Sequence, residues 1–330
     1  MPGPKTHDIF YKNLKEKLDQ KTLESFPNYD KYNIFVQGHD FLIYHDFYKK
    51  VSKKALDENV ERSVQLQEHK FQEFVYNYLK NAEESGSLEQ EDVRLFIGPG
   101  YVMHHLLDAY THPQIIYYAG DHTKNPEYKT WYHGILENLL DIYMMDKYEN
   151  KNAKNYKVYK DFEIDKSLIS DELIKTIDDS LRSTYGIVGG GKIFDDAFLQ
   201  LALFMRVMKY DKTGIKRVLF DAIDPITKGS KSFSYHRDYD GVLPSLNLNH
   251  EEWLNPTDGS IISTESFIDL YEKALDDGAY IVDELEKICQ TGTIHKDDVY
   301  SIIPNISSVH GLECEREFQL KYTKKKTNNR

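Results

Sequence analysis

Histidine and carboxylate residues recur at four-residue steps in two apolar segments of the chain. The first segment, HHLLDAYTH, places His104, Asp108 and His112 at positions i, i+4 and i+8. The second, HGILE, repeats the step with His133 and Glu137. Because a helix repeats every 3.6 residues, side chains four residues apart share one face, with a drift of roughly 40° per step. The spacing predicts two helices whose imidazoles and carboxylates converge on a metal site.

His105 adjoins His104 but points elsewhere on the same helix. Successive helical residues are about 100° apart around the axis. We therefore expect His105 to lie behind the ligands or on the surface rather than to bind metal directly. For the segment as a whole, the alternative is a polar stripe on an exposed helix whose other face, with Leu106 and Leu107, is in the core.

Composition limits the chemistry that remains open. The 330 residues are 40% hydrophobic and 13% aromatic, which is enough for a sizeable core. Acidic residues outnumber basic ones by 54 to 42, and the net charge of −12 argues against a broad nucleic-acid-binding surface while permitting metal cations. With only Cys289 and Cys314, the chain can form neither a disulfide framework nor a Cys₄ zinc site. A metal is therefore expected to use nitrogen and oxygen ligands.

The chain start, MPGPKTHDIFYKNLKEKL, has no apolar stretch followed by a small-residue cleavage site. Its longest apolar stretches, such as residues 198–207, are broken by polar residues well before the roughly 20 needed to cross a bilayer. We expect a cytoplasmic protein without a transmembrane segment.

Apolar residues recur with helical rather than strand periodicity, which predicts an all-α fold. Helices are expected near residues 8–18, 58–81, 100–112, 130–146, 170–183, 193–208, 213–220 and 263–288. Pro99 and Gly100 are expected to open the helix of the first histidine segment, and Pro113 to close it. The Lys- and Asn-rich stretch 147–160 predicts a boundary between a metal-binding region, residues 1–148, and a C-terminal helical region, residues 149–330, whether or not the two pack as one domain.

Two stretches of the C-terminal region have alternative interpretations. The sequence YGIVGGGK, residues 185–192, is similar to a phosphate loop, but Ile193 stands where Ser or Thr would follow the lysine, and no strand precedes it. A glycine-rich connection between helices is the favoured interpretation. The aromatic stretch 228–256 predicts either a cover over the active site or a packed loop.

Two further candidates lie upstream, His7 near the chain start and Asp40 within QGHD. Each is weak alone, because His-Asp pairs recur by chance. They form an ordered set with His69 within LQEHKFQEF, the HxxxD segment, a further histidine and the HxxxE segment. The order of this set resembles that of the ligands in the zinc-dependent phospholipase C family. The resemblance covers residues 1–148 and is nearest to an intracellular-looking bacterial branch, because the founding secreted enzymes use a processed N-terminal tryptophan as a ligand and this chain begins Met-Pro-Gly-Pro.

The resemblance implies a multi-helix bundle of the P1 nuclease type, here extended by C-terminal helices, and a cluster of two or three zinc ions. It implies eight ligands: His7, Asp40, His69, His104, Asp108, His112, His133 and Glu137. Asp108 would be the bridging carboxylate. Asp40 would combine metal ligation with orientation or deprotonation of the attacking water, which makes it the candidate catalytic residue.

The ligand types themselves indicate a reaction. Neutral imidazoles and carboxylates suit zinc, and neighbouring divalent ions lower the pKa of water and neutralise a phosphodiester. We expect a hydrolase of phosphate esters, most simply a phospholipase C-like phosphodiesterase that acts on a phosphate-ester substrate such as a phospholipid.

Two other functions remain open. His39 and Asp40 form an HD pair, which is typical of HD-type nucleotide phosphohydrolases; that interpretation makes His39 an essential ligand and leaves the HxxxD and HxxxE segments unused. The other is a non-catalytic, metal-stabilised helical binding protein, which would hold its metal in a closed coordination shell.

Overall fold

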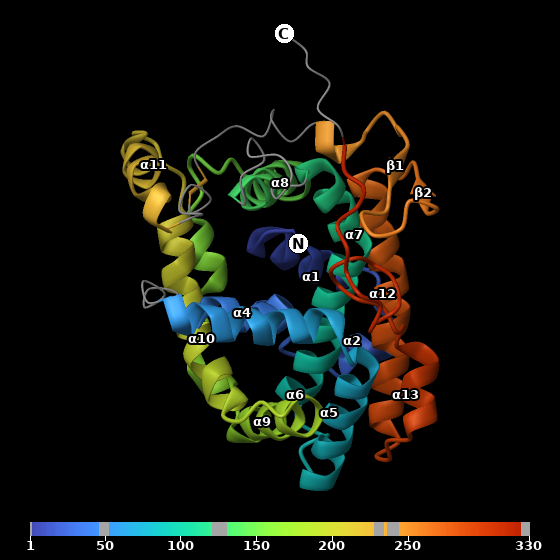
Figure 1. Ribbon diagram of the computed structural model, residues 1–330. Coiled ribbons are helices and arrows are strands. Elements are labelled where there is room, and N and C mark those ends of the chain that lie inside the picture. Colours follow the sequence, from blue (N-terminus) through green and yellow to red (C-terminus); the bar gives the residue numbers. More distant parts are fainter. Residues whose placement is uncertain (1, 46–52, 121–130, 228–233, 236–243, 325–330) are drawn as a thin grey trace.

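A computed structural model of the chain describes residues 2–45, 53–120, 131–227, 234–235 and 244–324 (Figure 1). Within them the α-helices are α1 (Pro4–Leu14), α2 (Gln20–Glu24), α3 (Phe41–Tyr44), α4 (Lys53–Glu68), α5 (Phe71–Ser85), α6 (Glu91–Leu95), α7 (Met103–Ala119), α8 (Trp131–Glu149), α9 (Asp171–Tyr185), α10 (Gly190–Met208), α11 (Ile215–Thr227), α12 (Phe267–Gln290) and α13 (Lys296–Ile302). Short 3₁₀ segments occupy Tyr29–Lys31, Asn33–Asp40, Val158–Phe162 and Lys166–Leu168, and a π-helical segment spans Phe96–Val102. The strands of the described part, β1 (Trp253–Leu254) and β2 (Ile262–Ser263), pair antiparallel. The predicted all-α fold is confirmed.

Helix α7 is the element around which the candidate site is built. It packs against α12, α8, α1 and the segment Asn33–Asp40, and runs beside α12 in Figure 1. All of its residues except Tyr110 and Tyr117 are buried. A helix buried on every side belongs to the core, so the alternative of a polar stripe on an exposed helix is wrong for this segment.

Helix α1 begins four residues earlier than the sequence pattern predicts, which brings His7 inside it. Pro4 occupies the first turn, where its missing N–H is not needed. The Asp141 carboxylate of α8 accepts hydrogen bonds from the backbone N–H groups of Lys5, at 3.2 Å, and Thr6, at 2.8 Å. A Cβ at Gly3 would overlap this carboxylate. The start of α1 is therefore fixed by a partner more than 130 residues away, which local patterns do not indicate.

The prolines around the first histidine segment do not delimit its helix. Pro99 lies within the π-helical segment, which leads from α6 directly into α7, and Pro113 lies inside α7, which continues to Ala119. Both predicted boundaries are wrong. Pro113 cannot donate to the carbonyl of Ala109, but Gly311 approaches that oxygen so closely that an added Cβ would lie 2.5 Å from it. Gly311 thus packs closely on the carbonyl that Pro113 leaves without a helical donor.

Other helix boundaries agree with expectation to varying degrees. The predicted helix 58–81 is two helices, α4 and α5, because the chain turns at Lys70 with a left-handed φ of 55°. Residues 185–192 form the predicted glycine-rich connection, in which Gly186 ends α9 and Gly189 precedes α10, both in the left-handed conformation. In the aromatic stretch 228–256, Phe233, His236 and Arg237 lie outside the described residues, as does residue 130 at the start of the predicted helix 130–146. Tyr235 and Trp253 of the same stretch are buried.

The regions 1–148 and 149–330 contribute to one buried hydrophobic cluster. A buried ion cluster also joins them. Lys5 Nζ of α1 contacts Asp8 at 2.6 Å, Glu149 at 2.9 Å and Asp161 at 2.6 Å, and Lys5 itself is fully buried. These three carboxylates lie close enough together to hold a metal ion, but the lysine ammonium already supplies the cation. Glu149 and Asp161, at the two ends of the predicted boundary, are therefore both tied to α1 through Lys5.

Replacing Lys5 by methionine is expected to lower the free energy of unfolding by about 3–5 kcal/mol, because it removes the fully buried ammonium that three carboxylates share. Lys12 would still contact Asp8 and Glu149 but not Asp161. Urea denaturation followed by circular dichroism measures this change. The matched control is Lys15→Met, which removes an exposed pair with Asp30 and is expected to change stability by about 1 kcal/mol or less. Equal effects of the two substitutions would contradict a structural role for the Lys5 cluster.

Candidate metal centre

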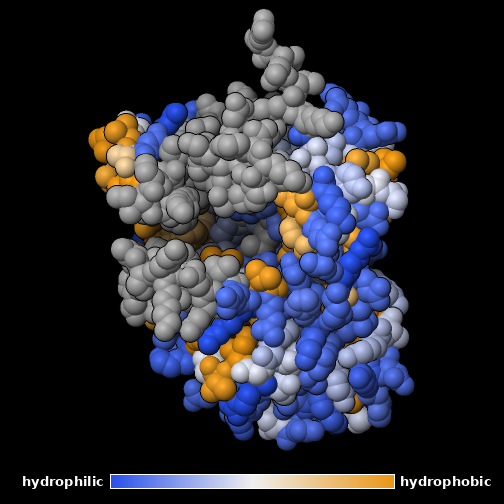
Figure 2. All heavy atoms as spheres, in the orientation of Figure 1, coloured by the Kyte–Doolittle hydropathy of each residue, from blue (hydrophilic) through white to orange (hydrophobic). Residues whose placement is uncertain are grey.

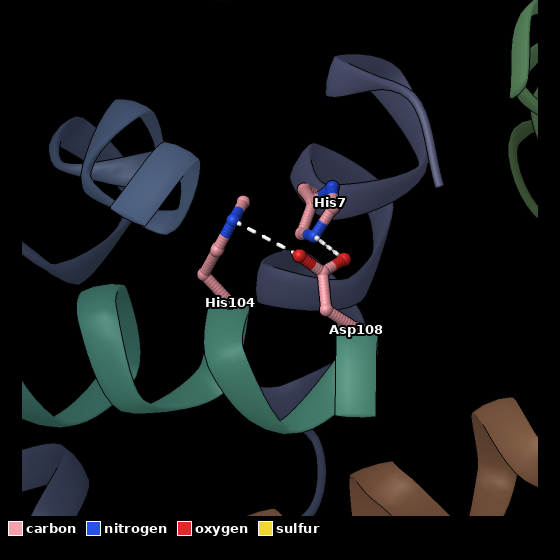
Figure 3. A group of neighbouring side chains, drawn as sticks. All are labelled: His7, His104 and Asp108. Atoms are coloured by element: carbon pink, nitrogen blue, oxygen red, sulfur yellow. Dashed lines mark ion pairs between the residues drawn. The ribbon is translucent and has the colours of Figure 1, made fainter. Parts of the chain in front are cut away.

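Asp108 lies between two histidines that come from different helices. Its Oδ1 is 3.2 Å from Nε2 of His7 on α1, and its Oδ2 is 3.3 Å from Nε2 of His104 one turn earlier on α7 (Figure 3). The two imidazole rings stack with centroids 4.2 Å apart. All three side chains are almost completely inaccessible to solvent. The predicted helical face of His104 and Asp108 is therefore present, and α1 adds His7 to it.

A second group adjoins the first and shares His104. Asp40 Oδ1 is 3.5 Å from His39 Nδ1 and 3.9 Å from His104 Nε2. Both residues follow Gly38, whose φ of 47° and ψ of −131° suit glycine alone. A Cβ at Gly38 would lie 2.5 Å from Cγ of His104. The glycine thus allows the segment Asn33–Asp40 to pass directly over the histidine ring and to bring Asp40 beside it.

The atoms that face one another across these two groups meet only as ion pairs or at longer distances. Among the described residues, no hydrogen bond reaches six of these buried nitrogen and oxygen atoms: His7 Nε2, His39 Nδ1, Asp40 Oδ1, His104 Nε2, and Oδ1 and Oδ2 of Asp108. Each such atom costs about 1–3 kcal/mol when it is left unsatisfied. Gathered in one place, they fit the requirements of bound divalent cations, which would ligate them.

The opposite nitrogens of the same imidazoles are bound to the backbone. His7 Nδ1 lies 3.1 Å from the Gly3 carbonyl, and His104 Nδ1 lies 2.9 Å from the Val36 carbonyl. A carbonyl accepts but never donates, so Nδ1 must carry the hydrogen in both rings. When such a ring is neutral, its Nε2 presents a lone pair to the group. This is the arrangement in which metal-ligating histidines are commonly oriented by a second hydrogen bond.

The remaining predicted ligands, His112, His133 and Glu137, form a third group at the contact between α7 and α8. His112 Nε2 is 3.2 Å from His133 Nε2, which is itself 2.9 Å from Glu137 Oε1. His112 Nδ1 donates to the Ser308 carbonyl at 3.2 Å, as in the other two histidines. His133 and Glu137 retain part of their solvent exposure. The structure thus brings His112, His133 and Glu137 together, closer to the surface than the first two groups.

Burial governs protonation in the first two groups. It lowers the pKa of His39 to about 4 and also depresses that of His104, so both imidazoles are neutral. Burial raises the pKa of Asp40 to about 6, against the attraction of His104. Burial also disfavours the charged forms of Asp108 and His7. Contacts with His104 and His7 nevertheless keep the pKa of Asp108 well below its usual range. Contact with Asp108 raises the pKa of His7 above its usual range. A proton on His7 therefore balances Asp108, and a metal ion would take over that role.

Two histidines of the sequence pattern lie outside these groups. His69 is half-buried at the end of α4, where its carbonyl accepts a hydrogen bond from Tyr185, and no described contact joins it to the other predicted ligands; its ligand role stays a prediction. His105 is fully buried. Its ring stacks on Phe71 with centroids 3.6 Å apart, and its Nε2 lies 2.7 Å from the Ile306 carbonyl. His105 therefore packs in the core, away from the predicted ligands, rather than on the surface.

Two parts of the site are indicated weakly or not at all by the sequence patterns. His39 enters the second group directly, and its only local signal is the HD pair that follows Gly38. The C-terminal segment 306–310 contributes backbone: the carbonyls of Ile306 and Ser308 accept from His105 and His112, and Ser308 Oγ lies 3.4 Å from His39 Nε2. Backbone carbonyls carry no residue-specific signature, so no motif could have indicated this segment.

Comparisons with known proteins found no counterpart: no protein-family model, no curated protein and no solved structure matches the chain. The resemblance to zinc-dependent phospholipases C therefore rests on the order and types of the ligands alone. No helix of the described residues is long and apolar enough to cross a membrane.

The adjacent histidines of α7 provide a matched test of the site. We expect His104→Gln to lose at least one tightly bound divalent ion per chain, because His104 faces both buried groups. His105→Gln should retain the full metal content, since its ring contacts Phe71 and a carbonyl instead. Elemental analysis after dialysis against metal-free buffer gives the stoichiometries, and equal losses in the two variants would contradict the assignment.

Proposed function

We propose that this chain is a metal-dependent hydrolase of phosphate esters that holds a zinc cluster between α1, α7, α8 and the segment Asn33–Asp40. One observation carries the proposal: six buried nitrogen and oxygen atoms of His7, His39, Asp40, His104 and Asp108 face one another without hydrogen bonds from the described residues. In a purely structural network such buried atoms would be paired through hydrogen bonds, whereas here the nearest approaches are the ion pairs of Asp108 with His7, at 3.2 Å, and with His104, at 3.3 Å.

Ligand chemistry favours zinc among the common divalent ions. The first two groups present three imidazoles and two carboxylates, and the third presents two imidazoles and one carboxylate. Calcium and magnesium prefer all-oxygen shells, whereas zinc is bound by histidine nitrogen together with carboxylate oxygen. Asp108 offers one oxygen toward His7 and the other toward His104, as a carboxylate shared between two ions would. Two or three ions fit this donor set.

Phosphoester hydrolysis is the reaction that such a set supports. When bound, the ions would supply Lewis acidity, which lowers the pKa of water and offsets the charge of a phosphodiester. Asp40 is the residue we assign to orient and deprotonate the attacking water, because its Oδ1 lies at the edge of the cluster without a hydrogen bond from the described residues. His7 and His104 are held in place by Gly3 and Val36, and this keeps their Nε2 atoms directed at the cluster.

Phospholipids are the substrate class that the resemblance to zinc-dependent phospholipases C suggests, and we propose a phospholipase C-like phosphodiesterase. The two cysteines, Cys289 and Cys314, are buried as free thiols, which supports the proposed cytoplasmic location.

A nucleotide phosphohydrolase of the HD type is the second candidate. The observation that favours it is the position of His39, which lies beside Asp40 in the buried cluster rather than apart from it. Glu137 separates the two candidates, because an HD-type site does not use it. Metal content that falls in His39→Ala but is unchanged in Glu137→Ala would favour the nucleotide phosphohydrolase.

Hydrolysis of bis-p-nitrophenyl phosphate tests the proposed reaction. We expect the zinc-loaded chain to turn over this reagent, a chelator to abolish turnover, and added zinc to restore it. Metal that remains bound without hydrolysis of either this reagent or phospholipid vesicles would contradict the proposal and favour a metal-stabilised binding protein.

Replacing Asp40 by asparagine is expected to lower kcat by about 10²-fold or more, as the loss of a general base does, while most of the metal is retained. Asp161→Asn is the control, since Asp161 pairs with Lys5 and lies outside the three histidine-containing groups. The kinetic constants are measured together with metal content. A normal kcat in Asp40→Asn would remove Asp40 from the catalytic role.

A further inference from the structure

Helix α11 presents an unburied apolar face. Ile215, Val218 and Leu219 are spaced so that they share one side of the helix, and they are 70%, 70% and 55% exposed. Of the residues 215–223, whose burial is described, none is buried. Figure 2 shows the corresponding apolar surface at the outer edge of the molecule, where Figure 1 places α11. A helix of this length with its apolar side in water gains little from packing, so a surface that covers this side would stabilise it.

The start of α11 is nevertheless firmly anchored. Asp211 accepts hydrogen bonds from the backbone N–H groups of Gly214, at 3.0 Å, and Arg217, at 2.9 Å. Lys216 Nζ donates to the carbonyl of Lys209 at 2.7 Å and also to that of Val207. These bonds fix the direction in which the helix leaves α10. The exposed face is thus held in a defined orientation on the protein.

Basic residues accompany this apolar face in an otherwise acidic chain. Between residues 206 and 217 the sequence has five basic side chains, Arg206, Lys209, Lys212, Lys216 and Arg217, against one acidic side chain, Asp211, so its formal charge is +5 − 1 = +4. The whole chain carries −12. Arg206 has an acidic partner in Glu163, and Arg217 a weaker one in Asp221, but Asp211 is mostly buried and engaged in the backbone bonds above. With Lys216 held by two backbone carbonyls and Arg206 paired with Glu163, Lys209, Lys212 and Arg217 supply the positive charge next to the exposed apolar side chains.

We propose that α11 is an interfacial helix that lies on an anionic lipid surface, with Ile215, Val218 and Leu219 inserted among the headgroups and the basic stretch 206–217 against the lipid phosphates. An apolar face flanked by lysine and arginine is the pattern of helices that lie in the plane of a membrane interface. A symmetric contact between two copies of α11 fits less well, because it would bring two basic stretches together.

This docking would present the metal centre to substrate in a bilayer. α11 lies at the same end of the molecule as α8, which carries His133 and Glu137 (Figure 1). The inference that the substrate is a phospholipid in an anionic bilayer rests on the proposed function, whereas the docking itself does not depend on catalysis.

Vesicle sedimentation with the full-length chain tests the docking. Vesicles of phosphatidylcholine with phosphatidylserine are compared with vesicles of phosphatidylcholine alone. We expect binding to the first, weaker binding to the second, and weaker binding as salt is raised. The double variant Val218→Asp/Leu219→Asp should lower the partition coefficient by about tenfold or more, because it places two charges in the inserted face. The control Ile262→Asp alters an equally exposed apolar side chain on β2 and should bind as the wild type does.

Hydrolysis of bis-p-nitrophenyl phosphate keeps this test separate from catalysis. The double variant should hydrolyse this soluble reagent at the wild-type rate, which also reports correct folding. Asp108→Asn, in which we expect no turnover, should still bind vesicles. Absence of vesicle binding by the wild type, or equal binding by the double variant, would overturn the docking. So would a concentration-dependent dimer that the double variant abolishes while vesicle binding is unchanged, since the face would then belong to self-association.

Discussion

The structure depends on one carboxylate that is buried without a hydrogen bond from the described residues. Asp108 lies in the middle of α7, inaccessible to solvent, with only the imidazoles of His7 and His104 facing its oxygens. A buried charge is costly unless a cation or several donors balance it. Helix α1, the turn at Gly38 and the backbone carbonyls behind the imidazoles are arranged around this requirement. On the function proposed above, the fold in this region supports a cation beside Asp108.

Several irregular features of the chain lie around the same residues. The π-helical segment Phe96–Val102 and the enclosed Pro113 disturb the helix on either side of the ligands, yet α7 remains continuous through both of its histidine groups. Gly38 adopts a backbone conformation reserved for glycine so that Asp40 reaches His104. The C-terminal segment 306–310 returns to the site and fixes His112 through a carbonyl. Elements far apart in sequence are thus brought together to orient a few ring nitrogens.

Spacing along the sequence predicts the part of the site that lies on single helices. His104, Asp108 and His112 share α7, and His133 and Glu137 share α8, because a helix imposes its own period on side chains four residues apart. Spacing does not predict which residues from different elements come into contact. The proline rule predicts the end of α7 at Pro113, whereas the helix continues to Ala119 and Gly311 packs on the Ala109 carbonyl. His7 and Asp40 were identified by their order in a family pattern, His39 was ranked below its neighbour, and the placement of His69 leaves its predicted role without a described contact to the cluster.

Anomalous diffraction from crystals of the full-length chain grown with zinc tests the central claim most directly. Data collected on both sides of the zinc absorption edge locate the ions without reference to activity. The account predicts a peak bound by Nε2 of His7 or His104 and by an oxygen of Asp108, at ligand distances of about 2.0–2.2 Å. Contradiction would come from a map with no anomalous peak near Asp108, in which hydrogen bonds from ordered water satisfy its two oxygens instead.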